Sequence, residues 1–271
     1  MASQWIRKNF LTTATCAVFA FFLSAAVSAE EMVDRSDLVR VFEDEGMNGS
    51  FALLDVADNR LVVVNAERVF QRFIPASTFK FANSLIALEL GVIADENEII
   101  PYGGEPQPFK AWEQDMRIGN AFAVSNVPVF QELARRVGKD RYTELLENLS
   151  YGNGTVGAEV ERFWLDGPLK ISAVEQVRFL AALATWRLPF SNHSQTLVHD
   201  ISVIESRNNA ILYGKTGWTV ASDPGIGWFV GWVQNNDNVY AFALNMDMRS
   251  QNNAPQRVAM ARRLLSELGV Y

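Results

Sequence analysis

A short motif in the first third of the chain reads Pro75-Ala76-Ser77-Thr78-Phe79-Lys80. The residues that follow it are mostly apolar up to Gly91, so residues 77–90 are predicted to form a helix that ends at this glycine. Ser77 and Lys80 are three positions apart, and they therefore lie one turn apart on the same face of that helix. The motif thus predicts a serine and a lysine whose side chains can interact.

This serine and lysine suit nucleophilic catalysis. A serine hydroxyl is a weak nucleophile and needs a neighbouring base. Lys80 can be that base only if its ammonium loses a proton, which burial favours, and its neighbours Phe79, Phe81 and Ala82 predict a buried position. The helix N-terminus adds a backbone N–H and a dipole that favour negative charge near Ser77. The alternative for an isolated S-x-x-K pair is a capping serine followed by a solvated lysine.

A second motif, Lys215-Thr216-Gly217, follows an apolar strand predicted over residues 210–214. Lys215 and Thr216 can bind an anion such as a substrate carboxylate, and Gly217 lets a substrate backbone approach closely. The next residue, Trp218, can offer a backbone N–H to an oxyanion. The alternative is a lysine at the end of a strand, before a turn.

A third motif, Ser125-Asn126-Val127, precedes Pro128 and a helix predicted over residues 129–137. A serine in such a loop can pass a proton to a leaving nitrogen. The alternative is that Ser125 caps the helix that follows it.

Strands are predicted near both ends of the sequence and helices between them. Apolar patterns and turn residues place strands at 50–56, 61–65, 210–214, 227–234 and 239–245, and helices at 77–90, 129–137, 141–149, 172–185 and 255–268. Ser172 and Glu175 form a capping box at the start of one helix. The pattern predicts a mixed α/β fold with a central antiparallel sheet, built from both ends of the chain and flanked by helices. A helical lobe is inserted at roughly residues 78–200, and residues 30–271 form a single catalytic domain.

The first 29 residues have the pattern of a signal peptide. Arg7 and Lys8 precede an apolar stretch at 11–23, and Val27-Ser28-Ala29 is a small-residue cleavage site. This stretch is short for a membrane span of ~20 residues. We therefore expect a periplasmic protein without a stable membrane anchor.

Composition argues against several other functions. The net charge is −7, and a chain without a basic stripe is a poor nucleic-acid binder. Cys16, the only cysteine, lies in the predicted signal peptide, and His193 and His199 are the only histidines. No metal site and no organic cofactor are therefore expected. Whether the protein is a monomer or a homodimer stays open.

The motif order S-x-x-K, loop serine, K-T-G is similar to that of the penicillin-recognising serine enzymes. Among them, the chain resembles a class D, or oxacillinase-type, serine β-lactamase. Class A enzymes have S-D-N at the second motif, whereas this chain has Ser125-x-Val127. The class D pattern continues with Tyr151-Gly152-Asn153, Phe163-Trp164-Leu165 and Arg257. The resemblance implies the fold shared by serine β-lactamases and penicillin-binding transpeptidases.

The resemblance also implies an activity that confers antibiotic resistance. The β-lactam ring of a penicillin-type substrate would be hydrolysed through an acyl-enzyme on Ser77. Lys80, carboxylated on its nitrogen by CO2, would be the general base for acylation and deacylation. Trp164 would donate its indole N–H to this carbamate, while Val127 and Leu165 would keep the pocket apolar.

The remaining implied roles concern the substrate. Ser125 would lie between Lys215 and the leaving nitrogen, Arg257 and Thr216 would bind the substrate carboxylate, and Trp112 would line the mouth of the site. For Arg257 the alternative is a surface arginine on the last helix, beside Arg262 and Arg263. Alternative functions for the whole chain are a β-lactam-sensing penicillin-binding domain and a cell-wall D,D-peptidase.

Overall fold

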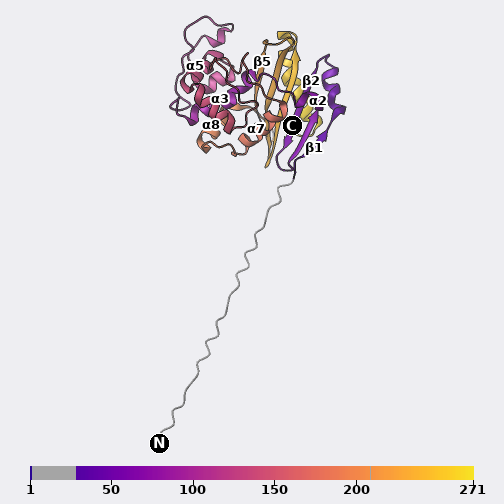
Figure 1. Cartoon of the computed structure of the whole chain (residues 1–271). Helices are drawn as coiled ribbons and strands as arrows, with labels where there is room; N and C mark the ends of the chain where they lie inside the picture. Colours follow the sequence, from indigo (N-terminus) through magenta and orange to yellow (C-terminus); the bar gives the residue numbers. More distant parts are fainter. Residues whose placement is uncertain (2–28, 208) are drawn as a thin grey trace.

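The computed structural model describes residue 1 and residues 29–207 and 209–271. Apart from its two end positions, the predicted signal peptide at 1–29 lies outside the described residues. Figure 1 shows strands and helices gathered around one sheet. Over the described part of the chain, no helix is both long and apolar enough to cross a membrane.

The sheet has seven strands in the order β1-β3-β2-β7-β6-β5-β4. Its neighbours pair in antiparallel fashion, except for the parallel pair of β1 and β3. At its centre β2 pairs with β7, so the first and last parts of the chain meet there, with Phe51 opposite Leu244. The strands are β1 (Glu31–Asp34), β2 (Gly49–Asp55), β3 (Arg60–Val64), β4 (Val203–Arg207), β5 (Ala210–Thr219), β6 (Gly225–Asn235) and β7 (Asn238–Met248).

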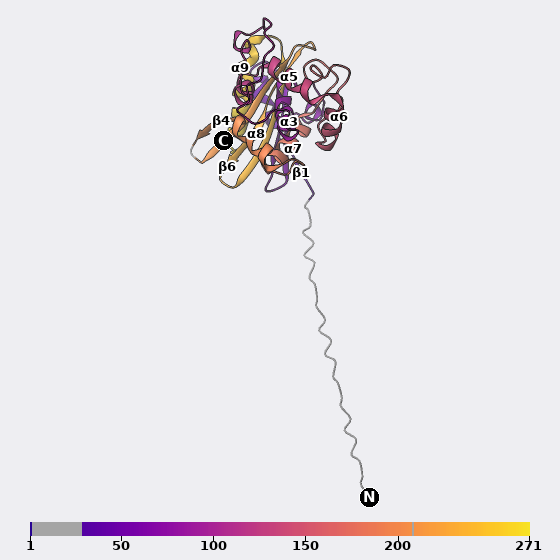
Figure 2. The ribbon, with the colours of Figure 1, turned by 90° about the vertical axis from the view of Figure 1, so that its left-hand side faces the viewer.

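Helices cover both faces of the sheet, which confirms the predicted mixed α/β fold (Figure 2). Alternate residues of β2 enter two separate apolar cores: Ala52 and Leu54 face the larger one, and Phe51 and Leu53 the smaller one. The larger core packs against α3 (Lys80–Glu89), α4 (Ile118–Ala123), α5 (Val127–Val137), α6 (Lys139–Asn148), α7 (Ala173–Ala184) and α8 (Asn192–Ser202). The smaller core packs against α1 (Arg40–Glu43) and α9 (Ala254–Glu267), while α2 (Ala66–Val69) follows β3.

Several predicted elements agree with the structure to within a few residues. The capping box that begins α7 is present, with Ser172 and Glu175 in reciprocal hydrogen bonds. The expected helix start at Ser77 is a 3-10 turn, η2 (Ala76–Phe79), and the α-helix begins at Lys80. Other 3-10 turns are η1 (Ser36–Val39), η3 (Lys110–Trp112) and η4 (Gln251–Asn253).

The predicted end of the strand at residue 214 is wrong. β5 continues through Lys215, Thr216 and Gly217, which pair with residues of β6. The prediction failed because a lysine and a threonine interrupt the apolar run. A polar residue is nevertheless compatible with a strand when the backbone ladder is satisfied by both neighbours. Edge strand β4 was also missed, because its residues are largely exposed and carry charges.

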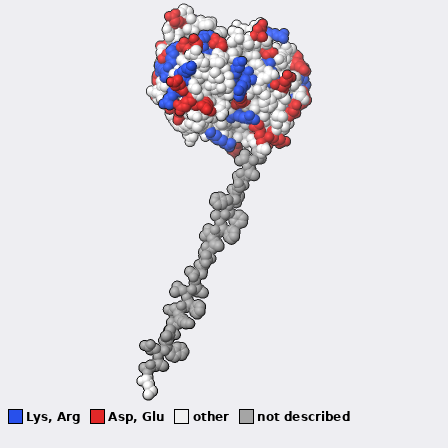
Figure 3. Space-filling model, in the orientation of Figure 1, with Lys and Arg blue, Asp and Glu red and all other residues white. Residues whose placement is uncertain are grey.

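On the face shown in Figure 3, basic and acidic side chains are interspersed. Charged side chains form surface ion pairs, such as Arg40 with Glu267 at 2.9 Å and Arg263 with Asp44 at 2.9 Å. Such exposed pairs contribute little to stability, about 0–1 kcal/mol each. The fold is held mainly by the two apolar cores.

Candidate active site

Ser77 lies in the turn η2, at the point where the chain enters α3. Its Oγ accepts a hydrogen bond from Nζ of Lys80, at 3.3 Å. Ser77 is partly exposed, whereas Lys80 is 0 % exposed. The solvated-lysine alternative for this motif is therefore wrong, and the serine is accessible while the amine beside it is buried.

The surroundings of Lys80 are aromatic and apolar. Its Nζ lies 4.7 Å from the centre of the Phe130 ring. Among the described residues, no carboxylate forms an ion pair with it. Burial lowers the pKa of Lys80 well below its ordinary value, and the nearby charge of Lys215 lowers it further. The site therefore favours a neutral amine at this position.

Trp164 belongs to the same apolar core as Phe130. It is completely buried and stacks on Phe79 with ring centres 5.4 Å apart. Its indole Nε1 is a buried donor with no hydrogen-bond partner among the described residues. A buried donor without a partner is costly, so this atom marks a place where an acceptor belongs.

Lys215 is the second buried lysine, and β5 carries it. Its Nζ donates to the backbone oxygen of Thr216 at 3.3 Å and lies 5.7 Å from the centre of the Phe122 ring. Burial, and then the charge of Arg257, lower the pKa of Lys215 to about 7. Near neutral pH this lysine can therefore both accept and donate a proton.

Arg257 reaches from α9 to β5 rather than into solvent. Its Nη1 donates to the backbone oxygen of Gly217 at 2.5 Å, and its Nε donates to that of Ala254 at 2.9 Å. A Cβ added at Gly227 would lie 2.9 Å from Cδ of Arg257, so this glycine of β6 makes room for the arginine. Burial lowers the pKa of Arg257 to about 10. The surface-arginine alternative is wrong.

The structure gives a further reason for a glycine at position 217, Gly217, that could not be seen in the sequence. A Cβ at this position would lie 2.9 Å from the backbone oxygen of Pro75 and 3.0 Å from Cγ2 of Thr78. Only a residue without a Cβ lets β5 pass this close to the turn that carries Ser77. Gly217 was predicted to let a substrate backbone approach closely. In the structure, it also lets the turn that carries Ser77 approach β5.

Ser125 ends the segment after α4 in a left-handed conformation, with φ of 60°. It does not cap α5, because the side chain of Asn126 accepts the hydrogen bond from the backbone N–H of Val129 at 3.1 Å. The amide of Asn126 also donates to the backbone oxygen of Trp112 at 3.1 Å. The capping alternative for Ser125 is therefore wrong, and Asn126 ties Ser125 to the Trp112 turn.

These elements enclose a cavity of about 320 Å³. Nine predicted site residues line it: Ser77, Trp112, Ser125, Val127, Leu165, Thr216, Gly217, Trp218 and Arg257. Three further lining residues, Phe109, Ala111 and Val124, were missed, because an apolar residue in an irregular segment gives no signal of its position. The other three predicted residues, Lys80, Trp164 and Lys215, are buried in the protein interior.

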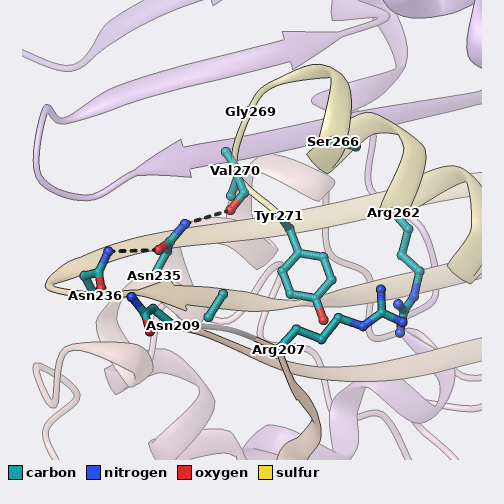
Figure 4. Close-up of a pocket in the computed structure, with 10 residues that line it drawn as sticks. Arg207, Asn209, Asn235, Asn236, Arg262, Ser266, Gly269, Val270 and Tyr271 are labelled. Atoms are coloured by element: carbon teal, nitrogen blue, oxygen red, sulfur yellow. Dashed lines mark hydrogen bonds between the residues drawn. The ribbon is translucent and has the colours of Figure 1, made fainter.

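A larger cavity, of about 730 Å³, lies elsewhere, between the β5–β6 region and the end of α9 (Figure 4). None of the predicted site residues lines it. Its charged groups are already paired, since Arg262 lies 2.5 Å from Glu205 and Tyr271 donates its hydroxyl to the same carboxylate. The smaller cavity at Ser77 is therefore the candidate active site.

Comparisons with known proteins agree on one family. The family model of the penicillin binding protein transpeptidase domain matches residues 47–266. Beta-lactamase OXA-5 of Pseudomonas aeruginosa is 38 % identical over 96 % of this chain and 98 % of its own length. Beta-lactamase OXA-48 of Klebsiella pneumoniae is 36 % identical over 93 % of this chain and 97 % of its own length.

Solved structures give the same result. The class D beta-lactamase FUS-1 (OXA-85) of Fusobacterium nucleatum subsp. polymorphum superposes with a TM-score of 0.85 and 39 % identity, covering 88 % of this chain and 99 % of that one. The class D beta-lactamase YbXI from Nostoc gives a TM-score of 0.84 and 42 % identity, covering 86 % and 99 %. Fold, motifs and identity over nearly the whole length lead to one conclusion: the chain belongs to the class D, OXA-type, serine β-lactamases.

Proposed function

We propose that this class D β-lactamase opens the β-lactam ring of penicillin-type antibiotics through an ester on Ser77, with Lys80 carboxylated on its nitrogen as the general base. One observation carries the proposal: a partly exposed serine hydroxyl lies 3.3 Å from a fully buried lysine amine that has no carboxylate partner among the described residues. Burial lowers the pKa of that amine and so favours its neutral form.

The residues around Lys80 fit a carbamate. Only a neutral amine attacks CO2, and the lowered pKa of Lys80 provides one. The product is an anion that needs a hydrogen-bond donor in a buried place, and the unpartnered indole N–H of Trp164 is such a donor. When present, the carbamate supplies an anionic oxygen base for the hydroxyl proton of Ser77 and for the hydrolytic water. Val127 and Leu165, which line the cavity, keep bulk water away from it.

Arg257 and Thr216 bind the carboxylate of the substrate in this proposal. Both line the cavity. Two hydrogen bonds to backbone oxygens hold the guanidinium in place, and its other N–H groups can donate to an anion. Since the charge of a substrate carboxylate is opposite to that of Arg257 and Lys215, this end of the cavity selects anionic acyl compounds.

Two backbone N–H groups, those of Ser77 and Trp218, stabilise the oxyanion that forms when Ser77 attacks the lactam carbonyl. Ser125 then passes a proton to the leaving lactam nitrogen, and Lys215 exchanges protons with Ser125. The pKa of about 7 of Lys215 suits that exchange near neutral pH. Both lysines thus act through their lowered pKa values.

We further propose that residues 1–29 are removed as a signal peptide and that residues 30–271 work in the periplasm as one catalytic domain. The central pairing of β2 with β7 supports a single domain, because it joins the two ends of the sequence in one sheet. The mass of the protein recovered from the periplasm tests the cleavage site.

Turnover of a chromogenic β-lactam tests the function. We expect many product molecules per enzyme molecule, and no covalent labelling by a fluorescent penicillin when Ser77→Ala removes the nucleophile. One product molecule per enzyme, followed by a stable acyl-enzyme, would instead indicate a β-lactam sensor. Labelling of the Ser77→Ala variant would place the nucleophile elsewhere.

A further inference from the structure

The residue directly before Ser77 has a backbone conformation that needs support. Ala76 has φ of 49°, in the left-handed region that a residue with a Cβ seldom adopts. It is 1 % exposed, so water does not stabilise this turn from outside. Conformations of this kind persist when the surrounding structure holds them. The direction of the Ser77 side chain depends on this residue, since Ala76 sets the path by which the chain enters η2.

Side chains hold the two carbonyl groups that precede Ala76. The hydroxyl of Thr78 donates to the backbone oxygen of Pro75 at 2.8 Å. The indole Nε1 of Trp228, from β6, donates to the backbone oxygen of Ile74 at 2.9 Å. Trp228 is 0 % exposed and Thr78 is 1 % exposed. The hydrogen bond to Pro75 is buried, and the one to Ile74 is partly buried. The turn is thus fixed from the sheet and from its own threonine.

Gln176 directs the hydroxyl of Thr78. Its side-chain Nε2 donates to Oγ1 of Thr78 at 2.9 Å, and Gln176 is 1 % exposed. Because the hydroxyl oxygen accepts this hydrogen bond, its proton can be donated to the oxygen of Pro75. A relay therefore runs from α7, through Thr78, to the residue before Ala76. On its other side Thr78 faces Gly217 of β5, where a Cβ would lie 3.0 Å from Cγ2.

We propose that Thr78 and Gln176 are positioning residues for acylation. Their relay holds the left-handed turn at Ala76, and that turn holds Oγ of Ser77 at 3.3 Å from Nζ of Lys80. The inference rests on the proposed role of Ser77 as nucleophile. Neither residue touches the substrate cavity, so their effect reaches the reaction through the direction of the serine. Misplacing a reacting group by about 1 Å can reduce a rate by roughly 10²-fold.

The experiment compares variants that keep or remove the relay. Thr78→Val keeps the branched shape and removes the hydroxyl, Thr78→Ser keeps the hydroxyl, and Gln176→Met keeps the length and removes the amide. Thr185→Val is the matched control, because its hydroxyl also donates to a backbone oxygen, that of Ala181 at 2.7 Å, at the far end of the same helix. For each variant, the rate at which a fluorescent penicillin labels the enzyme in the first turnover is measured over a range of concentrations by rapid mixing and acid quenching, which trap the ester before it hydrolyses. The fraction of enzyme labelled is measured in the same experiment.

We expect Thr78→Val and Gln176→Met to lower the maximal labelling rate at least about ten-fold. The half-saturating concentration and the labelled fraction should stay at their wild-type values. Thr78→Ser should restore most of the rate, and Thr185→Val should leave it unchanged. A purely structural role would lower the labelled fraction and not the rate of the folded molecules.

Wild-type labelling rates in both Thr78→Val and Gln176→Met would overturn the inference, as would a Thr78→Ser variant as slow as Thr78→Val. If Thr78→Val does not fold, the maximal labelling rate of Gln176→Met alone is compared with the wild-type rate. If the wild-type enzyme neither hydrolyses the chromogenic β-lactam nor is labelled by the penicillin, the failure concerns the proposed function, and the two cases are thereby distinguished.

Discussion

Arg68 and Lys80 are both buried cations, and their surroundings differ in one respect. Arg68, on α2, lies 2.7 Å from the carboxylate of Asp247, and its Nε donates to the side chain of Asn245 at 2.9 Å. Lys80 contacts the Phe130 ring and Ser77. One cation has a carboxylate partner and the other has none among the described residues.

This difference distinguishes a charged side chain that stabilises the fold from an amine that can take part in a reaction. A buried ion pair keeps both partners charged, and removing one partner leaves the other charge uncompensated. A buried lysine without such a partner instead loses its proton, because desolvation disfavours the charged form. The surroundings of Lys80 therefore favour its neutral form beside a serine hydroxyl, whereas Arg68 ties α2 to the end of β7.

The largest expected effect is on turnover. Lys80→Met should reduce hydrolysis of a chromogenic β-lactam by roughly 10²- to 10⁴-fold, because it removes the base. Arg68→Met should leave turnover per folded molecule near the wild-type value. Active-site titration of each variant normalises the rates to the folded fraction. Equal losses of turnover in Lys80→Met and Arg68→Met would contradict the different roles assigned to the two residues.

Stability should change in opposite directions. In CO2-depleted buffer at neutral pH, Lys80→Met should raise the free energy of unfolding by about 1–3 kcal/mol, because it removes an amine whose burial in an apolar place is costly. Arg68→Met should lower it by about 1–3 kcal/mol, because it removes the ion pair with Asp247 and the hydrogen bond to Asn245. Urea denaturation measures both changes, and a loss of stability in both variants would show that Lys80 contributes to the fold as Arg68 does.

The pH dependence of the Lys80→Met effect follows from the lowered pKa. As the pH falls below 10.5, the ordinary pKa of lysine, the unfolded chain binds a proton that the folded chain does not, so the wild type loses stability. The advantage of Lys80→Met should therefore be largest at neutral pH and shrink as the pH rises towards 10.5. An advantage independent of pH would mean that Lys80 stays charged in the folded protein.

A smaller effect is expected at Trp164. Trp164→Phe keeps an aromatic ring and removes the buried indole N–H, so we expect a roughly ten-fold loss of turnover in CO2-depleted buffer. Added bicarbonate should restore much of this loss, since it raises the carboxylated fraction of Lys80. Trp232→Phe is the control, because its buried Nε1 also has no partner among the described residues and it lies on β6, outside the cavity lining. Equal losses in the two variants would remove Trp164 from the proposed mechanism.

Much of the fold could be predicted from the sequence, because its signals are local. The capping box at Ser172 and the helix that ends near Gly91 depend on neighbours within one or two turns. The course of β5 through Lys215 depends on pairing with β6, and the reason for Gly217 depends on Pro75 and Thr78, far along the chain. Contacts between residues that are far apart in the chain cannot be predicted from the pattern of neighbouring residues.

The same distinction between local signals and contacts of distant residues applies to the active site. Motifs of the family gave Ser77, Lys80 and Lys215 from their residue types and spacing. Asn126 and Gln176 were missed as supporting residues, because a buried amide in a helix or a loop looks like any polar residue until its partners are known. The unpartnered N–H of Trp164 could only be seen in three dimensions.

The central proposal is that the buried amine of Lys80, which has no carboxylate partner among the described residues, takes up CO2. Carbon NMR of the enzyme equilibrated with isotope-labelled bicarbonate tests it directly, with Lys80→Met as the control. We predict a carbamate resonance in the wild-type enzyme that is absent from the variant, and activity that rises with bicarbonate after CO2 depletion. No resonance in the wild-type enzyme, together with activity that does not depend on bicarbonate, would contradict the claim.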